Sequence, residues 1–133
     1  MKKVMDRKSV LVAFQNSTEM EDIVRPLQTA GYRILQADSI LTFFDALERY
    51  EIDLLITDVE LPGVSMPALL PFMNQRYPLM KVIVVMRSYS PSLELDLRSH
   101  SVLYTMSWPV NGELLLSVVK KGLEHSAKQY IHA

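Results

Sequence analysis

Asp58 is the residue of this sequence best placed to do chemistry. It follows the apolar run 54–57 and opens the turn-forming segment 58–63, which contains Pro62 and Gly63. In open α/β sheets, ligands bind in the crevice beyond the carboxyl ends of the strands. A carboxylate at a strand tip is therefore the first candidate for a site, and its hard oxygens are ligands that Mg²⁺ accepts. The plainer interpretation is that Asp58 only caps its turn by accepting backbone amide hydrogen bonds.

The segments that must position Asp58 are short apolar runs typical of buried strands. Continuous rather than alternating apolar residues predict a parallel sheet that is covered on both faces. The runs rich in Val, Ile and Leu lie at residues 10–14, 33–37, 53–57, 81–86 and 101–105.

Amphipathic helical patterns lie between these strands and after the last one. Thr18 and Glu21 predict a capping box for the first helix, and Asn111 predicts a cap for the last. The leucines in residues 92–98 alternate, which also fits a strand, but the preceding Ser90-Pro91 favours a short helix. The other two predicted helices span residues 39–50 and 67–77.

Strands that alternate with helices predict right-handed crossovers and a doubly wound sheet. We expect an α/β fold of the flavodoxin-like class, with five parallel strands in the order 2-1-3-4-5. The carboxyl edge of that sheet would bring a small group of side chains together with Asp58. They are Phe14, Gln15, Met86, Arg87 and Trp108.

Composition limits the function classes. The 133 residues predict a single domain, residues 1–133 with a core at about 8–124, and no output domain. A net charge of −1 gives no electrostatic footprint for nucleic acid or an anionic membrane. The absence of cysteine excludes thiol chemistry and agrees with a cytoplasmic protein. No apolar stretch is long enough for a membrane span.

The segment 53–63 carries a resemblance to a known family. Its Asp-Val-Glu-Leu-Pro-Gly run, Pro109 and the Gly31-Tyr32 pair resemble the receiver domain of two-component response regulators over about residues 8–124. The resemblance implies the flavodoxin-like receiver fold and makes Asp58 the position of the phosphoacceptor. It also makes Trp108-Pro109 a candidate for a cis peptide bond.

The resemblance fails at the positions that would carry the phosphoryl chemistry. Phe14 and Gln15 stand where the family has two acidic residues, so we expect Mg²⁺ binding to be lost or very weak and no other cofactor. Met86 replaces a hydroxyl residue, Trp108 replaces a lysine, and Met66 replaces a glycine. The resemblance therefore implies a degenerate receiver.

Three kinds of residue could rescue the site. Arg87 could replace the lost positive charge, Ser88 could supply a displaced hydroxyl, and Glu19 or Asp22 could lean over the pocket. Trp108 has two interpretations, as a filler that packs on Phe14 or Met86 or as an exposed anchor for a partner.

We therefore predict a stand-alone, non-enzymatic receiver in a phosphorelay or two-component pathway, acting mainly as a phosphorylation-independent protein-interaction module. The resemblance implies a protein partner, such as a histidine kinase or an output protein, or a homodimer. Either would use the face formed by the fourth helix, fifth strand and fifth helix. One alternative is a conventional receiver phosphorylated on Asp58 by a histidine kinase. The second alternative is a flavodoxin-like module that binds a small ligand at the carboxyl edge.

Overall fold

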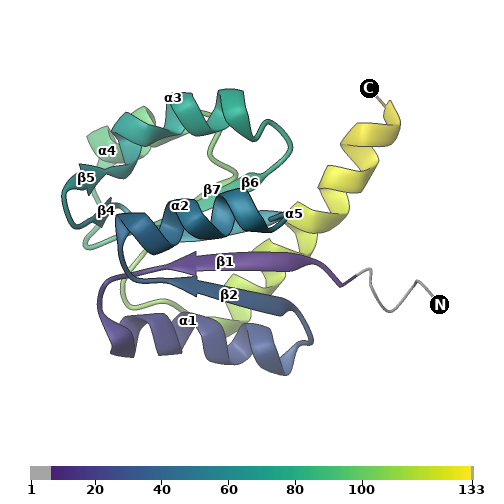
Figure 1. The fold of residues 1–133 in the computed structure, drawn as a ribbon, viewed down its shortest axis with the longest axis horizontal. Helices are drawn as coiled ribbons and strands as arrows, with labels where there is room; N and C mark the ends of the chain where they lie inside the picture. The colour runs from purple at the N-terminus through teal and green to yellow at the C-terminus, as the bar shows by residue number, and fades with distance from the viewer. Residues whose placement is uncertain (1–6, 133) are drawn as a thin grey trace.

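A five-stranded parallel sheet forms the centre of the molecule (Figure 1). The computed structural model describes residues 7–132, with side chains described as far as Glu124. The strand order is β2-β1-β3-β6-β7, which confirms the predicted order 2-1-3-4-5. A separate two-stranded hairpin, β4 and β5, was not predicted. The bounds are β1 Ser9–Ala13, β2 Arg33–Ala37, β3 Leu54–Asp58, β4 Glu60–Leu61, β5 Val64–Ser65, β6 Lys81–Met86 and β7 Tyr104–Ser107.

Helices cover both faces of this sheet, as the continuous apolar strands predicted. One buried cluster packs α2, α3 and α4 against the sheet, and a second packs α1 and α5 against the opposite face (Figure 1). The sheet is therefore buried on both sides. The helices are α1 Ser17–Thr29, α2 Ile40–Arg49, α3 Met66–Arg76, α4 Pro91–Arg98 and α5 Gly112–His132.

Parallel pairing brings the ends of the central strands to one edge. In the register of β3 with β6, Asp58 lies opposite Val85, one residue before Met86. In the register of β1 with β3, Ala13 lies opposite Thr57, so Phe14 leaves β1 beside Asp58. The predicted crevice residues therefore emerge at the same edge of the sheet.

Local signals predicted most helix and strand boundaries. Two predictions were wrong: the cap of the first helix and the start of the last strand. The side chain of Asn16, not Thr18, caps α1 by accepting a hydrogen bond from the Glu19 amide at 2.9 Å. The last strand begins at Tyr104 rather than at residue 101, because Ser101 has a positive φ of 63°, which is not an extended conformation.

Two ambiguous segments are resolved by the structure. Residues 91–98 form helix α4, and the Ser90 hydroxyl caps it by accepting a hydrogen bond from the Leu93 amide at 3.3 Å. The Trp108-Pro109 peptide bond is cis, as the resemblance implied. Among the described residues, no helix combines the length and apolar character that a membrane span needs.

Candidate functional site

Asp58 is the last residue of β3 and is almost completely buried, with 9% of the residue exposed. Its Oδ1 accepts a hydrogen bond from the Val59 amide at 2.8 Å. The chain then turns back through the β4–β5 hairpin, where Gly63 has a φ of 84° that favours glycine. The carboxylate therefore has the turn-capping role and also lies at the carboxyl edge of the sheet.

Arg87 supplies the positive charge closest to Asp58 among the described ion pairs. It follows β6 directly, and its Nη2 lies 3.3 Å from Oδ2 of Asp58. The same guanidinium donates a bidentate pair of hydrogen bonds to Glu19 of α1. Nη1 lies 2.7 Å from Oε2, and Nη2 lies 2.8 Å from Oε1. One arginine thus joins carboxylates from β3 and α1 into a compact cluster, which we call the Glu19–Arg87–Asp58 cluster.

An apolar wall closes the cluster on the side of β1. Phe14 is fully buried, and its ring meets Trp108 edge-on, with centroids 5.9 Å apart and planes at 73°. The Arg87 guanidinium lies 5.8 Å from the centre of the Trp108 ring, within cation–π range. Met86 and Met66 are also buried, but in the cluster on the opposite face of the sheet. Phe14 and Trp108 therefore form the apolar surface beside the Glu19–Arg87–Asp58 cluster.

Burial and charge act on the pKa of Asp58 in opposite directions. Removal from water raises the pKa above its ordinary value and is the largest influence. The Arg87 guanidinium and the Val59 amide lower it, and the Glu19 carboxylate raises it. The net result is a raised pKa, because burial outweighs the pairing with a half-exposed arginine.

Of the remaining predicted residues, only Glu19 contacts Arg87 or Asp58 in a described interaction. Gln15, Ser88, Pro109 and Asp22 are exposed, and no hydrogen bond within the described part of the chain ties the Ser88 hydroxyl to Asp58. Glu19 does lie over the site, through Arg87. These two residues are 68 positions apart, and no sequence signal predicts their pairing.

Donors for a metal ion are few at this edge. Among the side chains that the structure describes, no group of three or more His, Cys, Asp or Glu residues is placed to hold a metal ion. Phe14 contributes no oxygen, and the Glu19 carboxylate already binds the Arg87 guanidinium. The cluster holds one cation, a side chain of the protein itself.

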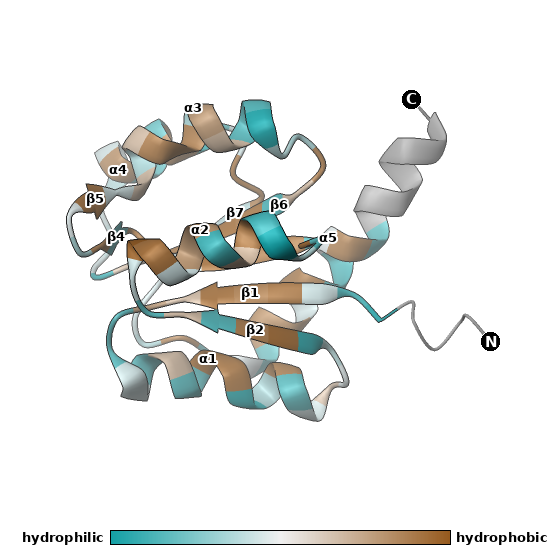
Figure 2. Ribbon diagram, in the orientation of Figure 1, coloured by the Kyte–Doolittle hydropathy of each residue, from teal (hydrophilic) through white to brown (hydrophobic). Residues whose placement is uncertain are grey.

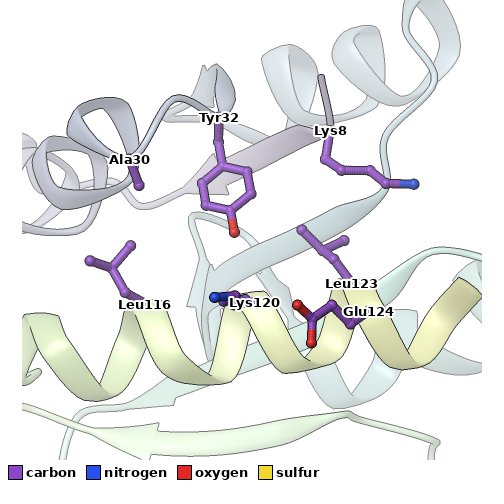
Figure 3. A pocket seen from close by; sticks show the side chains of 7 residues that line it. All are labelled: Lys8, Ala30, Tyr32, Leu116, Lys120, Leu123 and Glu124. Atoms are coloured by element: carbon purple, nitrogen blue, oxygen red, sulfur yellow. The ribbon is translucent and has the colours of Figure 1, made fainter. Parts of the chain in front are cut away.

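A separate hollow lies at the opposite edge of the sheet (Figure 3). It is an open depression of about 700 Å³ between the amino-terminal ends of β1 and β2 and the helix α5. Tyr32 points into it toward α5, and Lys120 and Glu124 lie on either side of the hydroxyl (Figure 3). None of the predicted site residues lines this hollow.

Solved structures show which fold this arrangement belongs to. A CheY-like response regulator receiver domain protein from Methanospirillum hungatei JF-1 superposes with a TM-score of 0.86 at 22% identity, over 93% of this chain and 99% of that one. The fold is that of a response-regulator receiver domain. No protein-family model matches the sequence, and no curated protein matches it either.

Two further structures share the receiver fold. The signal receiver domain of an HD domain-containing protein from Pseudomonas fluorescens Pf-5 has a TM-score of 0.85 at 22% identity, over 92% of this chain and 98% of that one. A response regulator from Burkholderia pseudomallei was solved with a phosphorylated aspartic acid, a calcium ion and citrate. It has a TM-score of 0.77 at 18% identity, over 94% of this chain and 74% of that one. At these identities the likeness extends to the fold.

Proposed function

We propose that this protein is a degenerate receiver that works in two-component signalling as a non-enzymatic, phosphorylation-independent protein-binding module. The observation that carries the proposal is the Glu19–Arg87–Asp58 cluster beside a buried Phe14. Asp58 keeps its place at the strand tip, but its charge is already met by a side chain of the protein. The module is proposed to act in the cytoplasm, without nucleic acid or membrane as a partner.

The donor set does not fit the Mg²⁺ ion that the receiver fold implies. Mg²⁺ needs several oxygen ligands in near-octahedral geometry, usually including carboxylates that are free to bind it. Phe14 offers no oxygen, Gln15 is exposed, and Arg87 already lies 3.3 Å from Oδ2 of Asp58. A divalent cation would have to approach this guanidinium closely, which like-charge repulsion opposes. Without such an ion, the charge on a transferring phosphoryl group would not be neutralised, which supports the proposal that phosphorylation is not the ordinary switch of this protein.

The proposed contact surface for a protein partner is the face formed by α4, β7 and α5. Leu95 of α4 is 72% exposed, Tyr104 of β7 is 39% exposed and Leu114 of α5 is 46% exposed. Exposed apolar side chains grouped on one face are a feature of interaction surfaces. A histidine kinase or an output protein is the kind of partner that we propose for this face.

The direct test is phosphorylation with a small phosphodonor in the presence of Mg²⁺, followed by intact mass measurement. We expect no gain of a phosphoryl group in the wild-type protein. Trp108 is the only tryptophan of the chain and lies beside the cluster, so its fluorescence reports Mg²⁺ binding in the same sample. A phosphoryl adduct that disappears in Asp58→Asn would overturn the proposal.

The alternative is a conventional receiver phosphorylated on Asp58. Two observations favour it: Asp58 lies at the strand tip, and the similar structure from Burkholderia pseudomallei contains a phosphorylated aspartic acid. The same mass experiment separates the two functions, and a cognate kinase can replace the small phosphodonor. The hollow in Figure 3 lies at the other end of the strands, so it does not support the small-ligand alternative at the carboxyl edge.

A further inference from the structure

The outer surface of α3 is apolar where a surface helix is normally polar. Residues 66–73 contain no polar or charged side chain. Met66, Leu70 and Met73 are buried against the sheet, but Phe72, on the other side of the helix, is 50% exposed. A helical segment that is apolar all round is normally covered on all sides. The described chain leaves Ala68, Pro71 and Phe72 of this segment exposed.

The neighbouring helix extends this surface. Leu41 of α2 is 80% exposed, and Phe44, one turn later, meets Phe72 edge-on with ring centroids 6.3 Å apart. Figure 2 shows hydrophobic colour on both the start of α2 and the first turns of α3. We call this surface the α2–α3 patch; it consists of Leu41, Phe44, Ala68, Pro71 and Phe72.

The charges around the patch balance and are paired with one another. Asp45 pairs with Arg49 at 3.2 Å within α2, and Arg76 of α3 pairs with Glu48 of α2 at 2.9 Å. The part of the rim formed by these two ion pairs therefore carries no net charge. Such a rim cannot steer a strongly charged partner, but a second copy meets it without net like-charge repulsion and brings charges of both signs.

We propose that the α2–α3 patch is the surface through which two copies of this protein associate about a two-fold axis. In a two-fold interface each copy presents the same patch to the other, so the exposed apolar area is matched on both sides. Phe72 is the expected centre of the contact, because large aromatic side chains dominate interface energies. The α4–β7–α5 face then stays available for a different protein partner.

The size of the patch sets the expected strength. Helices of 10 and 11 residues are each about 15 Å long and pack about 10 Å apart. The buried surface is therefore at or below the roughly 800 Å² per partner of a standard interface. We expect a weak, reversible dimer with a dissociation constant in about the micromolar to submillimolar range.

Sedimentation equilibrium of the full chain, from about 10 to 500 µM, tests the proposal. We expect the wild-type mass to rise toward that of a dimer with concentration. Phe72→Glu should raise the dissociation constant at least about tenfold, because it places two carboxylates at the centre of the contact. Leu95→Glu on α4 is the matched control, since it makes the same kind of change at another exposed position and should dimerise like the wild type.

Two results would overturn the proposal. One is a wild-type protein that stays monomeric over the whole concentration range. The other is a dimer that survives Phe72→Glu and is lost in Leu95→Glu, which would assign dimerisation to the α4–β7–α5 face. Leu41→Glu, at a position that is 80% exposed, provides a second disruption of the patch if Phe72→Glu fails to fold. Neither result depends on whether Asp58 is phosphorylated.

Discussion

At the scale of single residues, Asp58 and Arg87 show that an ion pair and a raised carboxyl pKa can coexist. Nη2 of Arg87 lies 3.3 Å from Oδ2 of Asp58. Half of the Arg87 side chain is exposed to solvent, which weakens its attraction for the carboxylate. Burial of Asp58 is the stronger influence and disfavours its charged form. The fold therefore favours the protonated form of Asp58 more than it would that of an exposed aspartate.

The first prediction concerns Asp58→Asn. Because the folded-state pKa is raised, the folded protein binds the Asp58 proton more tightly than the unfolded chain does. The contribution of Asp58 to stability therefore falls as the pH rises from its ordinary pKa through its folded pKa. We expect Asp58→Asn to be at least as stable as the wild type at pH 7, and to lose its relative advantage as the pH falls toward the ordinary pKa of aspartate. Urea unfolding of both proteins across this pH range measures the difference.

A markedly less stable Asp58→Asn protein at pH 7 would show that the Arg87 pair outweighs desolvation. Glu19→Gln is a useful companion variant, because it removes the other carboxylate bound to Arg87 and leaves Asp58 in place.

The second prediction concerns Arg87→Ala. Loss of the guanidinium removes an influence that lowers the pKa of Asp58 and leaves the repulsion from Glu19, so this pKa should rise further. Carboxyl carbon chemical shifts followed by NMR during a pH titration measure the change. Arg49→Ala is the control, because Arg49 belongs to an exposed pair with Asp45 in α2. An unchanged Asp58 titration in Arg87→Ala would show that the pair does not persist in solution.

At the scale of elements, side-chain caps determine where several helices begin. Asn111 accepts a hydrogen bond from the Leu114 amide at 2.9 Å at the start of α5. Ser39 and Thr42 form a reciprocal capping box at the start of α2. These local bonds satisfy amides that the helix itself leaves free, which is why short sequence patterns predict helix starts well.

The third prediction tests the cap of α5. Asn111→Ala should lower the free energy of unfolding by about 1 kcal/mol, because the Leu114 amide loses its partner. Asn111→Asp keeps an acceptor at the same position and should stay close to the wild type. Urea denaturation gives both values. Equal losses in the two variants would mean that the side-chain bond is not the source of the stability.

At the scale of the whole molecule, apolar side chains are buried on both faces of the sheet at its carboxyl edge. Phe14 is fully buried and meets Trp108 on the face covered by α1 and α5, whereas Met66 and Met86 are buried on the face covered by α2, α3 and α4. Trp108 Nε1 is buried without a hydrogen-bond partner among the described groups, so the packing is achieved at some polar cost. A charged residue introduced at Phe14 would therefore be buried among apolar side chains, which costs stability that the same change in an open pocket would not.

The fourth prediction concerns the double variant Phe14→Asp with Gln15→Asp. We expect it to lose about 3 kcal/mol or more of stability, because Phe14→Asp buries a charge among apolar side chains. Gln15→Asp alone changes an exposed side chain and should change stability little. Chemical denaturation with and without Mg²⁺ checks both. A double variant as stable as the wild type that also binds Mg²⁺ would contradict the apolar packing around Phe14 as the obstacle to a metal site.

The sequence alone predicted the strand order, the helices and the edge at which Asp58 lies. The helices and strands follow from local hydrophobic periodicity, caps and turns, which act over a few residues. The strand order follows from the alternation of strands and helices and from the fold class that it indicates. It also predicted that Phe14 and Trp108 would stand where charged groups are expected, since residue identity needs no coordinates.

Only the tertiary structure decided how these residues meet. The pairing of Arg87 with both Glu19 and Asp58 and the exposed patch across α2 and α3 each join segments that are distant in sequence. For Trp108 the sequence left two interpretations open, and in the structure its ring meets Phe14. Side-chain reach and burial after packing determine such contacts, and neither quantity is encoded in a local pattern. The tertiary structure therefore determines which charged side chains surround Asp58, whereas the sequence alone predicts that Asp58 lies at the end of a strand.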